Sequence, residues 1–226
     1  MSPHEETPLL TVKGPWGIPV RIAPSFLLLA LFLTGLSFTP SALALVGMVL
    51  VAIAAHEFGH AWATLAQGGR IGAITLWGGG GVCGAAGPED RAGREFVLWM
   101  GPLTNLGLWA VSSLICQIAS TGYGTGAGGA LYQIAVQSDL FAQVNLWLFV
   151  VNMMPVQPLD GGRLLELALH RVADPLASHR VAGLVGMVFT LAWLPAMAVS
   201  WTTFGWVILF MPSLAVHWRM ARARRA

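Results

Sequence analysis

The chain has 226 residues, of which 56% are hydrophobic and only 10% charged, with a formal net charge of +2 and a mean hydropathy of +0.69. Soluble domains usually carry about a quarter charged residues, so this composition excludes an ordinary water-soluble fold and indicates a polytopic membrane protein. The two cysteines, Cys83 and Cys116, are far apart and lack CxxC spacing. This excludes a disulfide framework and a cysteine-rich zinc site.

Six apolar runs predict an all-α membrane fold. They cover residues 24–38, 41–65, 95–119, 139–155, 181–200 and 203–218. Most of these runs approach the ~20 residues that a helix needs to cross a bilayer, although the first and last are short. Because six such helices would use nearly the whole chain, we expect a single transmembrane domain over residues 1–226.

The lysines and arginines predict how the chain is oriented in the membrane. They are Lys13, Arg21, Arg70, Arg91, Arg94, Arg163, Arg171, Arg180, Arg219, Arg222, Arg224 and Arg225. If both termini are cytoplasmic, all twelve fall on the cytoplasmic side, as the positive-inside rule requires. We therefore expect a multi-pass protein of the cell membrane, whose basic tail contacts anionic lipid of the bilayer rather than nucleic acid.

Two segments interrupt the helical pattern. In "RIGAITLWGGGGVCGAAGPEDR", residues 70–91, alternating and β-branched residues are followed by four consecutive glycines. This predicts a short Gly-rich β-hairpin or loop at membrane depth on the cytoplasmic side, where it should line a cavity. In "NMMPVQPLDGGR", Pro155 and Pro158 should break the fourth span near its inner end.

The stretch "AIAAHEFGHAW" contains an HExxH motif inside the second apolar run, formed by His56, Glu57 and His60. Histidines at i and i+4 lie on one face of a helix, so both imidazoles can reach one zinc ion. The adjacent glutamate can serve as a general base. Ionisable groups within a span are costly, which favours this interpretation over a hydrogen-bonded cluster that only packs helices.

A catalytic zinc site needs a third protein ligand at similar depth. His56 lies roughly 22 Å along the second run at ~1.5 Å per residue, and Asp160, at the broken inner end of the fourth run, should reach a similar depth. Asp139 begins the fourth run at the opposite membrane face. Glu166 and His170 lie beyond Asp160 in an amphipathic stretch and are expected to be surface groups.

These motifs resemble the site-2 protease family of intramembrane zinc metalloproteases, which carries HExxH and NxxPxxxLDGG in this order. "GIPVRIAPSFLLLALFL" is similar to the start of that family's first span, "GPLTN" (residues 101–105) to its GPxxN element, and "LWGGGGV" to its membrane-associated strand segment. The resemblance covers nearly the whole chain. It corresponds to a compact prokaryotic member without PDZ or CBS domains.

The resemblance also implies roles for individual residues. It makes His56, His60 and Asp160 the ligands of one zinc ion, Glu57 the general base, and Asn105 and Asn152 polar supports near the site. The amide of Asn105 would hold the substrate carbonyl or the oxyanion, or would instead form a hydrogen bond that packs two helices. Asn152 would support the site, or would only satisfy backbone groups freed by Pro155. Gln157 departs from the small residue or proline common there in relatives.

The expected function is therefore an intramembrane zinc metalloendopeptidase that cuts single-pass membrane proteins in or near the bilayer. The resemblance suggests anti-sigma factors or signal-peptide remnants as substrates. Independently, our hypothesis is that an exposed strand edge near Ile71–Trp77 binds an extended substrate segment by strand addition. One alternative is a metal-ion transporter, which should scatter polar residues over several spans and show repeat symmetry. The other is a non-catalytic membrane scaffold, which would have no need of Glu57.

Overall fold

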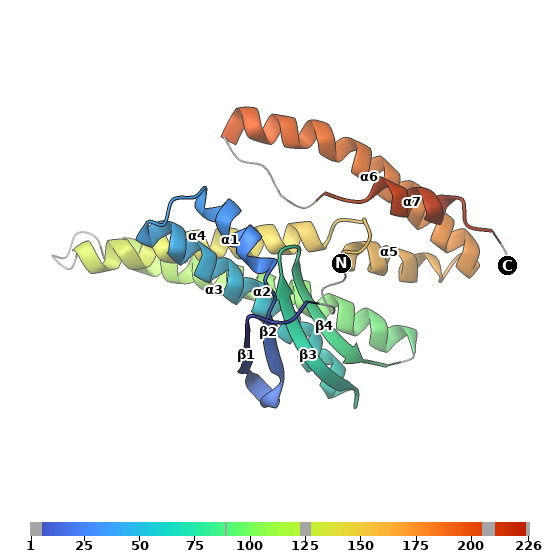
Figure 1. Cartoon of the computed structure of the whole chain (residues 1–226), viewed down its shortest axis with the longest axis horizontal. Coiled ribbons are helices and arrows are strands. Elements are labelled where there is room, and N and C mark those ends of the chain that lie inside the picture. The colour runs from blue at the N-terminus through green and yellow to red at the C-terminus, as the bar shows by residue number, and fades with distance from the viewer. Residues whose placement is uncertain (1–5, 89, 123–127, 205–210, 225–226) are drawn as a thin grey trace. The chain divides into compact units, whose positions relative to one another are not determined.

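The computed structural model describes residues 6–88, 90–122, 128–204 and 211–224. The chain is mostly helical, with a small β-sheet in its N-terminal half (Figure 1). Internal contacts divide it into two compact units, Met1–Phe149 and Val150–Ala226. Each unit is described separately below.

The first unit contains α1 (Phe26–Thr34), α2 (Pro40–Ala66), α3 (Arg91–Thr121) and nearly all of α4 (Gly128–Asn152). Two of these helices begin at polar N-caps. The Thr39 side chain accepts a hydrogen bond from Ala42 N, and Pro40 occupies the first turn of α2. The Asp90 carboxylate accepts from Gly93 N at the start of α3. Both arrangements satisfy amide groups that a helix start leaves without an internal acceptor.

Within the described residues, four helices are long and apolar enough to cross a membrane: Pro40–Ala66, Arg91–Thr121, Gly129–Asn152 and Pro175–Val199. They confirm helices at the second to fifth predicted runs, and they support a multi-pass membrane protein. The predicted fourth run began at Asp139, but α4 already begins at Gly128, so Asp139 lies inside this helix rather than at its start.

The count of six spans is not confirmed. Within residues 24–38, α1 has nine residues and ends at Gly35, whose φ of 53° is left-handed. Nine residues rise only ~13.5 Å, well short of a hydrocarbon core about 30 Å thick. The predicted run 203–218 falls partly outside the described residues, and its described part holds the start of α7 (Leu214–Ala221).

The sheet joins strands from two distant parts of the chain in the order β1-β2-β3-β4. β3 (Arg70–Trp77) and β4 (Gly80–Ala86) form the antiparallel hairpin that the sequence predicts. β1 (Leu10–Lys13) and β2 (Pro19–Ile22) come from the N-terminal arm, where no strand was predicted, and β2 pairs in parallel with β3. The predicted hairpin is therefore half of a larger sheet.

This order makes the predicted exposed edge near Ile71–Trp77 wrong for part of β3. Ile74 to Leu76 pair with β2 on one side and with β4 on the other. In the part of the chain that the structure describes, β4 pairs only with β3. The hairpin edges left for another strand are thus that of β4 and the start of β3, which β2 does not pair.

The core of the first unit lies between α2 and the sheet. Its buried members are Ile18, Val20, Phe26, Ile53, Ala61, Ile74 and Leu76. Ile74 and Leu76 are two residues apart on β3, so both point to the same face of the sheet. Because Ile53 and Ala61 flank the HExxH segment on α2, this packing fixes that segment against β3 and β4.

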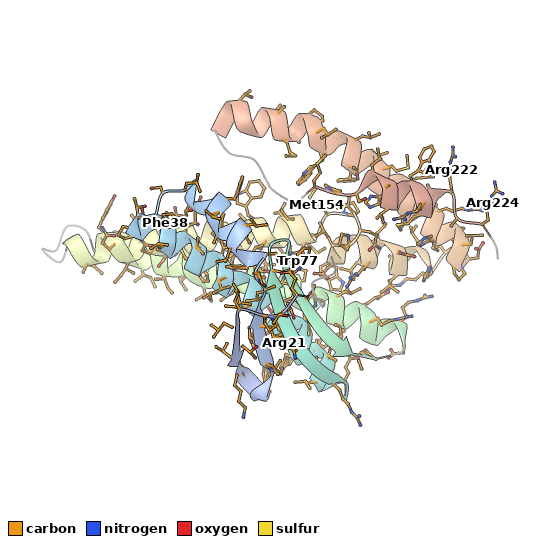
Figure 2. All side chains as sticks on the ribbon, viewed as in Figure 1. Arg21, Phe38, Trp77, Met154, Arg222 and Arg224 are labelled. Carbon is orange, nitrogen blue, oxygen red and sulfur yellow. The ribbon has the colours of Figure 1, made fainter. Side chains whose placement is uncertain are left out.

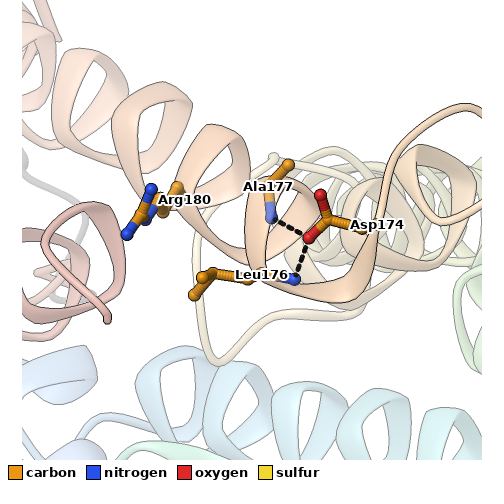
Figure 3. Close-up of a pocket in the computed structure, with 4 residues that line it drawn as sticks. All are labelled: Asp174, Leu176, Ala177 and Arg180. Carbon is orange, nitrogen blue, oxygen red and sulfur yellow. Dashed lines mark hydrogen bonds between the residues drawn. The ribbon is translucent and has the colours of Figure 1, made fainter. Parts of the chain in front are cut away.

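The second unit contains α5 (Asp160–Leu169), α6 (Pro175–Phe204) and α7 (Leu214–Ala221). Asp174 caps α6 by accepting hydrogen bonds from Leu176 N and Ala177 N, each 3.0 Å long. These residues and Arg180 line an open hollow of about 380 Å³ (Figure 3). The C-terminal end of α7 lies beside this hollow, because Arg180 Nε donates to Ala223 O over 2.8 Å. Figure 2 shows Arg222 and Arg224 there, and the Arg222 guanidinium lies 3.9 Å from the centroid of the Trp218 ring.

Candidate metal centre

The middle of α2 carries the motif residues His56, Glu57 and His60, all of which are buried. The two imidazole rings meet edge to face, with centroids 4.7 Å apart and an interplanar angle of 84°. Their Nε2 atoms are 3.1 Å apart. The i, i+4 spacing thus brings two potential ligand atoms to one point, as the sequence predicts.

The protonation of His60 follows from its neighbour on α3. Its Nδ1 lies 2.7 Å from the carbonyl oxygen of Val97. A carbonyl oxygen can only accept, so Nδ1 must carry the proton and donate it. In the neutral ring, Nε2 is then the unprotonated nitrogen.

The protonation of His56 follows from Asn105, which is fully buried on α3. The amide nitrogen of Asn105 donates to Ala52 O over 3.2 Å and to Asn145 Oδ1 over 2.9 Å. Its Oδ1 is therefore the atom that accepts from His56 Nδ1, over 2.7 Å. This leaves Nε2 of His56 unprotonated in the neutral ring, as in His60.

Two unprotonated nitrogens that face each other at 3.1 Å are placed to share one cation. Two zinc–nitrogen bonds of 2.0–2.1 Å at a tetrahedral angle need a nitrogen separation of about 3.3 Å, close to that observed. Space for an ion is kept by Gly101 on α3. A Cβ there would overlap His60 Nε2 and lie 2.8 Å from His56 Nε2. The residues present therefore fit a zinc ion.

Asn145 belongs to this hydrogen-bond chain, although no role was predicted for it. It is fully buried on α4, accepts from Asn105, and donates to Phe141 O over 2.9 Å. The sequence did offer a signal for Asn145, namely an amide side chain within an apolar span, where polar side chains need hydrogen-bond partners. Asn145 thus extends the hydrogen-bond chain that holds His56 from Asn105 on α3 to α4.

Glu57 lies against β4. A Cβ at Gly81 would be 2.6 Å from Glu57 Oε1 and 2.8 Å from its Cδ, so a side chain there would displace this carboxylate. Burial, and to a smaller degree the negative charge of Glu57, raises the pKa of the Cys83 thiol to about 12. The predicted Gly-rich segment thus forms a wall beside the proposed base.

The other predicted site residues belong to the second unit. Asn152 is the last residue of α4, and Asp160 is the buried first residue of α5. Gly161 and Gly162 let this first turn approach the preceding backbone, because Cβ atoms there would meet Met154 O at 2.6 Å and Val156 O at 2.5 Å.

Glu166 and His170 were predicted to be surface groups. Glu166 is instead partly buried. It accepts a hydrogen bond from Gln157 Nε2 over 3.3 Å and pairs with His179 Nδ1 at 2.8 Å. His170 is also partly buried, at the C-cap of α5. The prediction is therefore wrong for Glu166, whose carboxylate joins α5 to α6 and to the preceding loop.

The fold and the histidine geometry support a multi-pass membrane protein with a candidate metal centre of the HExxH type. Residues 129–194 match the sequence profile described as Peptidase family M50. "Putative zinc metalloprotease Rip3" of Mycobacterium tuberculosis is 34% identical over 55% of this chain and 30% of that protein. "Zinc metalloprotease MJ0392" of Methanocaldococcus jannaschii is 28% identical over 89% of this chain and 56% of that protein.

A solved structure has the same fold. "Site-2 Protease from Methanocaldococcus jannaschii" matches with a TM-score of 0.64 and 22% identity over 96% of this chain and 97% of that one. The profile and the relatives show similarity to zinc metalloproteases and to Peptidase family M50, and the solved structure shows that the fold is that of a site-2 protease. The chain spans less than two thirds of the length of the curated relatives it matches.

Proposed function

We propose that this protein is an intramembrane zinc metalloendopeptidase that hydrolyses peptide bonds in or near the transmembrane segment of single-pass membrane proteins. The observation that carries the proposal is the convergence of two unprotonated Nε2 atoms next to a buried glutamate, on a helix long and apolar enough to span a membrane. The zinc metalloprotease names of the relatives agree with it.

His56, His60 and Asp160 are the proposed ligands of one zinc ion. The two imidazoles are held for this by Asn105 and Val97. Asp160 is proposed as the third ligand from its carboxylate chemistry and from the LDGG motif. When bound, zinc supplies Lewis-acid chemistry that activates water and polarises a peptide carbonyl. Three protein ligands leave one coordination position open, as catalytic zinc sites require.

Glu57 is the proposed general base. Its carboxylate accepts a proton from the attacking water and then delivers it to the leaving amine nitrogen. Gly81 leaves room for this carboxylate, and β4 shields it on one side. Asn105 acts through His56, because both of its amide hydrogens are already donated to Ala52 and Asn145. Asn152 is proposed as a further polar support.

The substrate segment is proposed to bind as an added strand. A helical substrate must unwind before hydrolysis, because its carbonyl oxygens are engaged in its own hydrogen bonds. The edge of β4 offers backbone groups to an extended segment, and β4 also flanks Glu57. Proline substitutions scanned through residues 82–85 should abolish cleavage and leave bound zinc unchanged. Unchanged cleavage throughout the scan would rule out strand addition at this edge.

The membrane setting follows from the charge pattern. We propose a multi-pass protein of the cell membrane with both termini in the cytoplasm, whose two units form one metalloprotease domain. The arginine and lysine distribution supports this orientation. Candidate substrates are anti-sigma factors and signal-peptide remnants. Reporter fusions at each terminus and in the connection between α3 and α4 test the orientation, since both termini should report the side of the membrane opposite to that connection.

The deciding experiment uses the purified full chain in lipid nanodiscs. Bound zinc is measured by elemental analysis, and cleavage of a single-pass substrate is compared between wild type and Glu57→Gln. We expect both proteins to bind zinc and only the wild type to cleave, with a loss of at least ~100-fold. Equal cleavage by both would refute the role of Glu57. Zinc flux into sealed vesicles without cleavage would instead indicate a transporter, and bound zinc with neither activity a scaffold.

A further inference from the structure

His217 on α7 is a fully buried histidine that the proposed chemistry does not use. Its Nε2 lies 2.9 Å from the backbone nitrogen of Gln157, in the loop that leads to Asp160. Its Nδ1 lies 2.9 Å from Ser213 O and 3.4 Å from Thr190 Oγ1. One imidazole therefore connects α7, α6 and this loop within the second unit.

The protonation state of His217 follows from these contacts. Ser213 O can only accept, and the Thr190 hydroxyl already donates to Gly186 O over 2.7 Å, so Nδ1 must carry a proton. The Gln157 amide can only donate, so Nε2 must be unprotonated. His217 is thus a neutral ring whose acceptor nitrogen is directed at a single backbone N–H.

Space for the ring is provided by α6. A Cβ at Gly186 would lie 2.5 Å from His217 Nε2 and 2.8 Å from its Cγ, and one at Gly183 would lie 2.9 Å from His217 O. These two glycines let α7 approach α6 closely enough to bury the imidazole. A ring that only filled space between helices would not need an acceptor directed at Gln157.

The anchored amide belongs to a tightly folded turn. Leu159 N donates to Val156 O over 3.0 Å, and Gly162 N donates to Leu159 O over 3.1 Å, which leads directly into α5. Val156 is almost completely buried, and a Cβ at Gly162 would lie 2.9 Å from Gln157 N. The position of Gln157 therefore affects that of Asp160 through the constrained backbone of Pro158 and Leu159.

The Gln157 side chain adds a second attachment. Its Nε2 donates to Glu166 Oε2, and the other carboxylate oxygen of Glu166 contacts His179 Nδ1 on α6. The backbone of Gln157 is thus held by α7, and its side chain by α5. Gln157, which departs from the family pattern, therefore has a structural role: it links α5 and α7.

We propose that His217 is a positioning residue, which fixes the turn carrying Asp160 by accepting the Gln157 N–H. The proposal deepens the proposed function and rests on it for the role of Asp160 as a zinc ligand. Residues that orient a metal ligand typically change metal affinity by 10–100-fold when replaced. α7 would thereby be part of the machinery that prepares the metal site, although it contributes no ligand.

The test compares three variants of the full chain in nanodiscs. His217→Leu removes the acceptor, His217→Gln retains an oxygen near the place of Nε2, and Thr190→Val is the matched control that leaves the Gln157 contact intact. Hydrogen exchange of residues 153–162 is measured on metal-free protein, and zinc affinity by competition with a chelator. Cobalt-substituted samples report the coordination geometry through their visible spectra.

We expect His217→Leu to speed exchange in residues 153–162 by roughly tenfold, to weaken zinc binding by about 10–100-fold, and to alter the cobalt spectrum. His217→Gln and Thr190→Val should remain close to wild type in all three measurements. Unchanged exchange in a folded His217→Leu protein would overturn the proposal. If exchange rises while even the wild type binds no zinc, the turn is positioned as proposed and the protease function fails.

A measurement on the wild type covers the case in which His217→Leu does not fold. Nitrogen-15 spectra of histidine-labelled protein, with His217 assigned through its proximity to the Gln157 amide, should show a neutral ring with Nδ1 protonated and Nε2 unprotonated. A protonated Nε2 could not accept from Gln157 and would overturn the proposal without any variant.

Discussion

The Nε2 atoms of His56 and His60 lie 3.1 Å apart, and each ring donates from Nδ1 to a fixed acceptor on α3. The tautomers are thereby set by Asn105 Oδ1 and Val97 O. Such outer hydrogen bonds hold ring orientation and raise the basicity of the ligating nitrogen. The arrangement of the two rings is therefore prepared for a metal by α3 before any ion arrives.

The space beside the two Nε2 atoms should depend on Gly101. In Gly101→Ala the added methyl group would occupy the place where an ion must sit against His60. We expect zinc affinity to fall by roughly 100-fold or more, since the ligand geometry itself is disturbed. Competition with a chelator measures this loss.

The matched control is Gly107→Ala on the same helix, where a Cβ meets nothing within 4 Å. It should bind zinc like the wild type. If Gly101→Ala also retained wild-type affinity while remaining folded, the space beside His60 would not be the metal position.

Replacing Asn105 should weaken zinc binding more than replacing Asn145. Asn105 is hydrogen-bonded directly to His56, whereas Asn145 is connected to it only through Asn105. Asn105→Ala removes the acceptor of the His56 proton, and zinc affinity should fall by about 10–100-fold. Asn145→Ala removes only one acceptor of the Asn105 amide, and the loss should stay below about tenfold. Chelator competition on both variants checks the order. If Asn145→Ala weakened zinc binding more than Asn105→Ala, Asn145 would not act on His56 through Asn105.

Much of the site was predictable because its parts are local. The HExxH spacing alone places His56 and His60 on one helix face. Residues 70–86 contain β-branched residues followed by glycines, which predicts the β3–β4 hairpin. The four confirmed long helices follow from apolar runs that a bilayer requires. In each case the signal lies within one continuous stretch of sequence.

The parts that escaped prediction depend on contacts between distant segments. β2 pairs with β3 across about fifty residues of sequence, and β1 and β2 are joined by a turn in which Trp16 has a φ of 54°. Periodicity carries no information about such pairings. Asn145 and His217 were missed for the same reason, since their partners Asn105 and Gln157 lie 40 and 60 residues away.

Gly81 should be required for activity but not for metal binding. In Gly81→Ala the new methyl group would press on the carboxylate of Glu57. A displaced general base costs 10²–10⁴-fold in rate, so we expect cleavage to fall by roughly 100-fold or more with zinc content unchanged. Gly72→Ala on β3 is the control, because its Cβ would make only an ordinary 3.5 Å contact with Gly84 O. Equal activity of both variants would exclude close contact between β4 and the base.

The reactivity of the Cys83 thiol should depend on the charge of Glu57. Burial and the Glu57 carboxylate raise the pKa of its thiol to about 12, whereas its ordinary value is 9.0. Since the thiolate is the species that alkylating reagents attack, labelling at pH 8 should be slow and should rise with pH throughout the alkaline range. Glu57→Gln removes the negative charge, so the pKa should fall and labelling at a fixed pH should become faster. Burial remains, however, so the rate should stay below that of an exposed thiol.

Iodoacetamide labelling followed by mass spectrometry measures these rates in metal-free Cys116→Ser protein, in which Cys83 is the remaining thiol. Glu57→Asp is the control, because it retains the charge and should label at nearly the rate seen with Glu57. If Glu57→Gln labels no faster than Glu57→Asp, the carboxylate is neutral or distant from Cys83. Glu57 could then not be an ionised base beside β4.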